Sequence, residues 1–396
     1  MASNTSINAS SDKATPTVLQ VLPRLTTGGV ERGTIEIAQA LVAAGWKAIV
    51  ASEGGPMVRE LDRIGAEHVT LPLASKNPLT IRRNGDRLAE VVRAKGVSLV
   101  HARSRAPAYS AKQAARACGV PFVTTFHGTY TMGPLGLKRR YNAIMAQGDR
   151  VIAISNFIKR HILAEYSLAC AIDESRIRVI PRGVDFNRFD PDKVSAERMI
   201  QLAHRWRLTD GEAVITLPGR LTRWKGQLVL IEALALLKDL PFRALLVGSD
   251  QGRVAYRDEV EAAARAAGLA DRVQVAGDCN DMPAAYMISD VVVSASTDPE
   301  AFGRVAAEGQ AMGRPVLAPR HGAAPEIIRD GETGWLFVPG NAASLAQVLR
   351  IALTLPAEAR QDLAAKAIAD MRARFPIEAM CTSTLAVYRE LLPEAP

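Results

Sequence analysis

Short apolar segments recur along this chain in two successive sets, and most of them lead into a turn and then a helical pattern. The first set lies at residues 17–25, 48–51, 68–73, 98–102, 122–126, 151–154 and 177–180. The second set lies at residues 213–217, 243–247, 272–276, 290–294, 315–318 and 334–337. Short apolar runs alternating with helices are typical of parallel sheets buried on both faces. We therefore predict an α/β fold with two doubly wound, Rossmann-like parallel sheets.

The chain length and one turn-rich segment suggest where these two units meet. A chain of 396 residues is long enough for two or three domains of about 150 residues each. Residues 181–191 (PRGVDFNRFDP) are rich in Pro, Gly and Asp, which favour turns. We predict one domain over residues 17–190, a second over residues 191–375, and a separate C-terminal helical segment over residues 376–396. Residues 1–16 are small, polar and non-periodic, and we expect a disordered tail there.

Hydropathy and cysteine spacing indicate a cytoplasmic protein. No apolar run approaches the roughly 18 to 20 residues that a membrane span needs, and the polar start lacks the apolar core of a secretory signal. The cysteines, Cys118, Cys170, Cys279 and Cys381, are far apart and lack metal-ligand spacing. We expect them to be reduced thiols.

The net charge of +8 is unevenly distributed, because residues 1–190 are strongly basic and the remainder is slightly acidic. A basic half suggests an anionic partner. Nucleic acid is disfavoured, since the basic residues are not interleaved with aromatic ones. Anionic lipid headgroups fit the cluster Lys138, Arg139 and Arg140, so peripheral association with a membrane surface is one interpretation. A surface that is merely basic is the alternative.

Two carboxylates, Glu300 and Glu308, stand with seven residues between them directly after the apolar segment at residues 290–296. Glu300 is predicted on the loop from a strand to a helix, which is where ligands bind in open parallel sheets. A rise of about 12 Å over eight helical residues would let one carboxylate meet a sugar ring while the other meets the ribose of the same sugar nucleotide. Backbone N–H groups near Gly303 would donate hydrogen bonds to a phosphate. The structural alternative is that acidic residues near a helix start stabilise the helix dipole.

Three further groups are predicted at the carboxyl ends of strands. Arg220 and Lys225 follow the first strand of the second set, where two cations would stabilise a diphosphate; solvated surface charge is the alternative. Gly28 and Gly29 follow the first strand, so the backbone there can approach an anion at a helix start; an ordinary tight turn is the alternative. His127 follows the strand at residues 122–126 and is expected to face the cleft; a purely structural histidine is the alternative.

Taken in this order, the motifs resemble those of the retaining glycosyltransferases of family 4, which have two Rossmann-like domains facing across a cleft, the GT-B fold. The resemblance implies that Glu300 binds hydroxyls of the transferred sugar, that Glu308 binds the ribose, and that Arg220 and Lys225 hold the diphosphate. It implies that His127 contacts the sugar or its leaving phosphate. The donor-binding residues that it implies are Gly28, Gly29, Arg220, Lys225, Val275, Glu300, Phe302, Gly303, Arg304, Val305 and Glu308.

The resemblance extends over nearly the whole chain. Ser155 and the run at residues 182–185 match it, and residues 322–326 and 330–335 are expected to line the donor pocket and to close the sheet. A terminal helix in this family crosses back onto the first domain, as residues 377–392 are placed to do. The match thins over residues 129–146, where acceptor specificity usually resides.

The resemblance implies transfer of a hexose from a nucleotide-diphosphate sugar with retention at the anomeric carbon. The acceptor is expected to be a glycan or a lipid-linked molecule, such as a lipopolysaccharide core. No cofactor and no metal are expected, because Asp190 and Asp192 of the one Asp-x-Asp sequence lie in the linker with a proline between them. The alternatives are a sugar-nucleotide epimerase of the same architecture, a nicotinamide-dependent oxidoreductase, and an inactive binding protein. The oligomeric state is not predicted.

Overall fold

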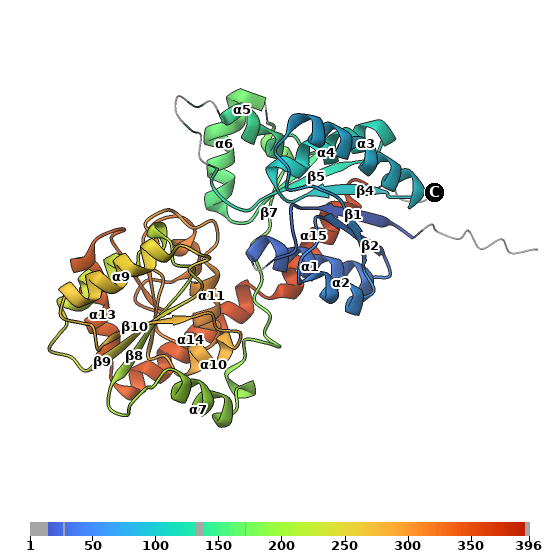
Figure 1. Cartoon of the computed structure of the whole chain (residues 1–396). Helices are drawn as coiled ribbons and strands as arrows, with labels where there is room; N and C mark the ends of the chain where they lie inside the picture. Colours follow the sequence, from blue (N-terminus) through green and yellow to red (C-terminus); the bar gives the residue numbers. More distant parts are fainter. Residues whose placement is uncertain are drawn as a thin grey trace, which may run out of the picture.

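The computed structural model describes residues 15–26, 28–130, 133, 136, 138–170 and 172–392. Most of the predicted N-terminal tail therefore lies outside the described residues. Two parallel sheets, each covered by helices, form two bodies joined side by side (Figure 1). The predicted α/β fold is confirmed. In the described part of the chain, no helix combines the length and the apolar character needed to cross a membrane.

The first sheet has seven parallel strands in the order β3-β2-β1-β4-β5-β6-β7. Its strands are β1 Thr17–Val21, β2 Lys47–Ser52, β3 Glu67–Thr70, β4 Leu99–Ala102, β5 Phe122–Phe126, β6 Arg150–Ala153 and β7 Ile177–Val179. The helices around it are α1 Gly29–Ala43, α2 Val58–Ile64, α3 Pro78–Ala94, α4 Arg105–Cys118, α5 Arg139–Asn142 and α6 Asn156–Cys170, with the 3-10 helices η2 Ala143–Ala146 and η3 Glu174–Arg176. The strand order reverses between β1 and β4, the position where open α/β sheets bind ligands.

The second sheet has six parallel strands in the order β10-β9-β8-β11-β12-β13. Its strands are β8 Ala213–Pro218, β9 Phe242–Val247, β10 Val273–Gly277, β11 Val291–Val293, β12 Val316–Pro319 and β13 Trp335–Phe337. The helices that follow β7 are α7 Ala196–Arg205, α8 Gln227–Ala235, α9 Val254–Ala266, α10 Met282–Met287, α11 Arg304–Ala311, α12 Ala324–Ile327, α13 Ala342–Leu353, α14 Ala357–Arg374 and α15 Ile377–Arg389, with 3-10 helices η4 Pro191–Lys193 and η5 Arg223–Lys225.

Each predicted strand is present, and the differences lie at the ends. The segment predicted at residues 17–25 forms strand only to Val21, because Pro23 cannot donate to a sheet ladder. Leu22 and Leu25 remain fully buried, so their apolar character reflects burial rather than strand. The C-terminal helix ends at Arg389, three residues before the predicted end at Leu392.

The chain passes between the two bodies twice, and the two passages lie side by side. Val184 N–H donates to the Phe375 carbonyl at 2.8 Å, and Ile377 N–H donates to the Val184 carbonyl at 3.1 Å. After the second passage, α15 packs against α1 of the first body (Figure 1). Its Tyr388 is fully buried, and the hydroxyl lies 2.7 Å from His101 Nδ1 on β4.

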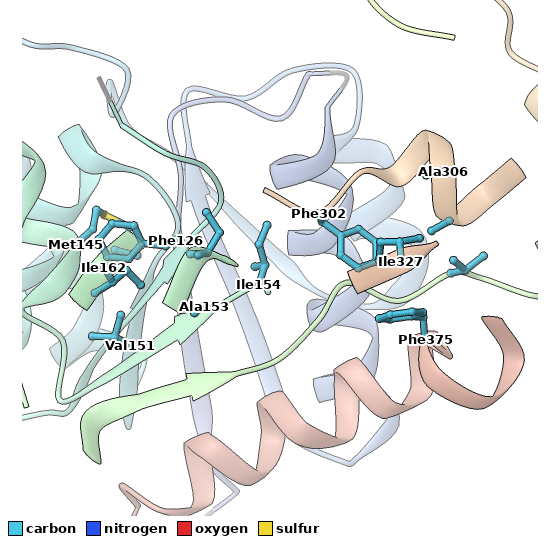
Figure 2. Close-up of a cluster of buried hydrophobic side chains, with 14 of the residues drawn as sticks. Phe126, Met145, Val151, Ala153, Ile154, Ile162, Phe302, Ala306, Ile327 and Phe375 are labelled. Carbon is cyan, nitrogen blue, oxygen red and sulfur yellow. The ribbon is translucent and has the colours of Figure 1, made fainter. Parts of the chain in front are cut away.

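One hydrophobic cluster continues from the first body into the second. Figure 2 shows Ile154, which follows β6, between Phe126 of β5 and Phe302 of the second body. The ring of Phe302 meets the ring of Phe375 edge to face, with centroids 5.6 Å apart.

Candidate active site

A cavity of about 420 Å³ lies where the carboxyl ends of the two sheets face each other. This volume is typical of a small-molecule site. From the first body it is lined by residues that follow β1, β5, β6 and β7, namely Gly29, Val30, His127, Gly128, Thr129, Ile154 and Arg182. From the second body it is lined by residues that follow β8 and β11, namely Arg220, Trp224 and the run from Asp298 to Arg304. Both sheets therefore contribute the ends at which parallel sheets bind ligands.

Glu300 lies on the loop between β11 and α11, as predicted, and its carboxylate is held in place. Lys225 Nζ lies 2.6 Å from Glu300 Oε1, and Ser296 Oγ donates to the same oxygen at 2.6 Å. Burial by itself would raise the pKa of Glu300, but the charge and hydrogen bond of Lys225 and the hydrogen bond of Ser296 outweigh it and lower this pKa. The group is therefore an ionised hydrogen-bond acceptor at neutral pH.

Gly322 supports the Glu300 loop from the next loop of the sheet. Its φ is +60°, and a Cβ at this position would lie 2.5 Å from the Glu300 carbonyl oxygen. The neighbouring Ala323 N–H donates to that oxygen at 2.9 Å. None of residues 322–326 lines this cavity, and the expected place of this run at the donor pocket stays a prediction. The run contacts the backbone behind Glu300.

Part of the predicted anion site at the start of α11 lines the cavity. Gly303 caps the helix with φ +92°, and Phe302, Gly303 and Arg304 line the cavity. Arg304 Nη2 lies 3.4 Å from Glu36 on α1, so this residue links the two bodies. Val305 is partly buried against the hydrophobic cluster and does not line the cavity.

Glu308 does not line this cavity with Glu300, and its predicted role at the ribose stays a prediction. Glu308 lies one helical turn after Arg304 on α11 and lines an adjacent cavity of about 270 Å³. Arg304 lines both cavities. Tyr286 on α10 donates its hydroxyl proton to Glu308 at 3.0 Å. Burial raises the pKa of Glu308 despite the nearby Arg304. The hydrogen bond from Tyr286 thus holds the Glu308 carboxylate at this adjacent cavity.

The two predicted cations follow β8 and reach the same wall. Arg220 lines the cavity directly. Lys225 lies on η5. Its ammonium nitrogen lies 4.3 Å from the centroid of the Trp224 ring and forms an ion pair with Glu300. Arg220, Lys225 and Glu300 are thus brought together, as predicted.

On the opposite wall, Gly29 lines the cavity at the start of α1, whereas Gly28 is the residue that caps the helix and does not line it. The Gly29 carbonyl accepts a hydrogen bond of 3.4 Å from Arg182. Burial raises the pKa of Glu31 in the first turn of α1, with Arg220 among the opposing charges. The two walls are therefore electrostatically coupled.

His127 lies directly after β5 and lines the cavity. Its Nδ1 lies 2.6 Å from Nη2 of Arg182. Burial, followed by the charges of Arg182 and Arg103, lowers the pKa of His127 well below its usual value. Arg182 was not predicted as a site residue, although it opens the run at residues 182–185 that matches the family resemblance.

Val275 lies on β10, the edge strand of the second sheet, and packs against the hydrophobic cluster of that sheet. It does not line the cavity. Its predicted role at the nucleotide base stays a prediction.

No group of three or more His, Cys, Asp and Glu side chains that could hold a metal is found in the described residues. Asp190 of the Asp-x-Asp sequence accepts from Asp192 N–H at 3.2 Å and so caps η4. The expectation that no metal is required stays a prediction.

Two Rossmann-like bodies with a cationic and carboxylate-lined cavity between the carboxyl ends of their sheets define the GT-B class of glycosyltransferases. Comparison with known families agrees: residues 27–188 match the model described as Glycosyltransferase Family 4, and residues 201–370 match that of Glycosyl transferases group 1. This chain belongs to glycosyltransferase family 4 and is a glycosyltransferase. The alternative of a nicotinamide-dependent oxidoreductase is therefore wrong.

Individual relatives support this assignment. A D-inositol 3-phosphate glycosyltransferase of Actinosynnema mirum is 32% identical over 292 residues, which cover 68% of this chain and 67% of that protein. A glycosyltransferase of Rickettsia africae has a crystal structure that superposes with a TM-score of 0.88 at 38% identity, covering 96% of this chain and 100% of that one. The Anabaena protein Alr3699/HepE, solved with UDP and glucose, has a TM-score of 0.81 at 24% identity, covers 94% of this chain and 99% of its own, and shows the fold alone.

Proposed function

We propose that this glycosyltransferase moves a hexose from a nucleotide-diphosphate sugar to a glycan or lipid-linked acceptor, with retention at the anomeric carbon and without a metal. The observation that supports this most directly is the Lys225–Glu300 ion pair at 2.6 Å beside Arg220 on one wall of the cavity. A carboxylate held in this way accepts hydrogen bonds from sugar hydroxyls. The neighbouring cations are suited to an adjacent diphosphate.

In the proposed reaction the diphosphate gains negative charge as it leaves the sugar. Arg220, Lys225 and the N-terminal end of α11 would stabilise that charge in the transition state. These groups take the place that a divalent cation has in metal-dependent transferases. Activity that is unchanged by EDTA is expected, and strict dependence on added magnesium would contradict this part of the proposal.

Retention is proposed from the resemblance to the retaining family. A covalent intermediate on Glu300 is disfavoured, because its carboxylate is already engaged by Lys225 and Ser296. Attack of the acceptor on the same face as the departing diphosphate, with a phosphate oxygen taking the acceptor proton, needs no protein nucleophile. Closure of the two bodies over the cavity would exclude water and so favour transfer over hydrolysis. Proton NMR of the product would show the anomeric configuration, and an inverted product would contradict the proposal.

A UDP-sugar is the first candidate donor, since the Anabaena structural neighbour was solved with UDP and glucose. The test is a thermal-shift panel of UDP-, GDP- and ADP-sugars without metal, because ligand binding raises the melting temperature by mass action. Lys225→Ala is the matched variant that should lose the shift. No shift with any sugar nucleotide would contradict the proposed donor class.

For the acceptor, we keep a glycan or lipid-linked molecule of the cell envelope, such as a lipopolysaccharide core, as the first proposal. The names of the sequence relatives favour a second candidate, a phosphorylated polyol such as inositol 3-phosphate. The cationic Arg182 on the first-body wall is compatible with a phosphorylated acceptor. Nucleotide release measured with each acceptor class, at one donor concentration, separates the two.

We also propose that the exposed residues Lys138, Arg139 and Arg140 at the start of α5 contact anionic lipid. Each basic residue near such a surface contributes about 1 kcal/mol. Co-sedimentation with vesicles that contain phosphatidylglycerol, compared with neutral vesicles, tests this. Equal recovery on both would contradict it, whatever the outcome for the transfer reaction.

An epimerase of the same architecture remains the alternative function. Incubation with UDP-GlcNAc in the absence of an acceptor distinguishes the two, because only an epimerase would form the epimer under these conditions.

A further inference from the structure

Two arginines lie buried beneath the first-body wall of the cavity without a carboxylate partner. Arg103 and Arg182 are 2% and 5% exposed, and neither forms an ion pair in the part of the chain that the structure describes. Burying a guanidinium without a counter-ion is costly, so hydrogen bonds must hold these groups. Arg103 donates to Gln20 at 2.7 Å, away from the cavity. Arg182, in contrast, lines it.

The guanidinium of Arg182 is held in a fixed place. Its Nη2 lies 2.6 Å from His127 Nδ1 and 3.4 Å from the Gly29 carbonyl oxygen, and its Nη1 lies 3.8 Å from Met380 Sδ. The guanidinium also packs against α1 at Gly33, where an added Cβ would lie 2.1 Å from Arg182 Nη1. The absent side chain at Gly33 is what gives the guanidinium room to reach His127.

This contact determines which nitrogen of His127 carries a proton. A guanidinium has donors and no acceptor, so His127 Nδ1 must accept the hydrogen bond and must be unprotonated. The single proton of a neutral imidazole is then on Nε2. That atom is buried and has no hydrogen-bond partner among the described residues, although His127 lines the cavity. Because buried polar groups are normally hydrogen-bonded, we expect the Nε2–H group of His127 to donate to an acceptor on the bound ligand.

We propose that Arg182 is a positioning residue that fixes His127 as the neutral Nε2–H tautomer, so that His127 donates a hydrogen bond to a substrate oxygen and does not act as a base. The substrate part rests on the proposed function. The tautomer itself depends only on the free protein.

The charges around His127 support the neutral form. Arg182 and Arg103 lie on the first-body side together with His101, and Arg304 faces His127 from α11. All of these groups are cationic or neutral, so an imidazolium would meet repulsion. Burial and these cations lower the pKa of Arg182 to about 9, which leaves its guanidinium protonated at neutral pH.

The first test is long-range ¹H–¹⁵N correlation of the histidine rings in the full chain without ligand. The His127 signals are assigned by their loss in His127→Gln. The expected result is one protonated Nε2 and one unprotonated Nδ1, constant from about pH 6 to about pH 8. An Nδ1–H tautomer, or titration within this range, would overturn the proposal with no need for a further variant.

The second test displaces the guanidinium in two independent ways. Arg182→Met removes it, and Gly33→Ala forces it away while both residues of the pair remain. We expect a mixture of tautomers or a titrating His127 in each variant, and partial recovery in Arg182→Lys, which restores one donor. Gly85→Ala on α3 is the control. Its added Cβ would likewise contact only the end of one flexible side chain, that of Gln113, which does not line the cavity. An unchanged His127 spectrum in folded Gly33→Ala would overturn the proposal.

The third test asks whether the Nε2–H donor is used. A glutamine amide nitrogen reaches the place of Nε2, whereas an asparagine amide nitrogen reaches only the place of Nδ1. His127→Asn should lower kcat/KM by roughly tenfold to a hundredfold, as expected when an acceptor is left unpaired, and His127→Gln should lower it less. Equal losses in both would contradict the donor role. A correct tautomer in a protein without transferase activity would instead contradict only the proposed function.

Discussion

Lys225 Nζ and Glu300 Oε1 lie 2.6 Å apart, although the two residues are 75 positions apart in the chain. The side chains are only 13% and 18% exposed, so water screens this pair much less than an ion pair on the surface. The loops after β8 and β11 bring the two residues together because these strands are neighbours in the sheet. Glu300 is consequently oriented before any ligand binds.

Removing either member of this pair should abolish most of the activity with little loss of fold. Lys225→Ala or Glu300→Gln should lower kcat by about a hundredfold or more, the range found when a preorganised electrostatic group is deleted. Arg223→Ala is the matched control, because Arg223 lies on the same 3-10 helix but pairs with Glu259 at the surface, 72% exposed. Its activity should stay within about twofold. Nucleotide release gives the rates, and full activity in either site variant would refute the assignment.

The pKa values of Glu300 and Glu308 are displaced in opposite directions, so their Gln variants should respond oppositely to pH. Lys225 lowers the pKa of Glu300 from its usual 4.5 despite burial. The resulting stabilisation is present above pH 4.5 and is lost as the pH falls through the lowered pKa. Burial raises the pKa of Glu308 from 4.5. Its stabilisation is present below pH 4.5 and is lost as the pH rises through the raised pKa.

Thermal unfolding from about pH 3 to about pH 7 checks this pair of signs, because the Glu300 change lies below pH 4.5 and the Glu308 change above it. The difference in melting temperature between the wild type and Glu300→Gln should grow in favour of the wild type as the pH rises. The difference between the wild type and Glu308→Gln should move in favour of the variant over the same range. Curves of the same sign for the two variants would show that one of the two environments is assigned wrongly.

Most strands were predictable because they are buried on both faces and are therefore largely apolar, as in β4 and β8. The loops at their carboxyl ends followed from topology, which is why Glu300 and Arg220 were found. The orientation of Glu308 was not predictable, since it depends on how α11 packs beside α10. The role of Arg182 was hidden for a similar reason: its burial is created by α1 and α15, which are distant in sequence.

Glu326 joins the two bodies by a contact that no local pattern indicates. Its carboxylate accepts from the backbone N–H groups of Asn156 at 2.9 Å and Phe157 at 2.6 Å, at the start of α6. The second body thus caps a helix of the first, and Ser155 adds a hydrogen bond of 2.7 Å to the Ala301 carbonyl beside Glu300. An arrangement of this kind couples domain closure to the donor loop.

Glu326→Ala should therefore loosen the two bodies. The loss of a cap costs about 0.5 to 2 kcal/mol, and we expect a raised KM for the donor together with a larger radius of gyration by X-ray scattering. Glu165→Ala is the control, since Glu165 pairs with Arg139 within the first body. An unchanged radius of gyration and KM in Glu326→Ala would show that this contact does not hold the bodies together.

Gly322 offers the sharpest separation between backbone strain and a steric effect on the site. A side chain at φ +60° costs about 1 to 2 kcal/mol, and Gly322→Ala adds a Cβ that would lie 2.5 Å from the Glu300 carbonyl oxygen, a backbone atom that cannot move alone. Gly331→Ala is the matched control, because Gly331 has φ +79° and nothing within 4 Å of an added Cβ. Both variants should lose stability in urea unfolding. Only Gly322→Ala should also displace Glu300 and lose activity, and equal activity in the two would show that the Glu300 loop does not depend on this contact.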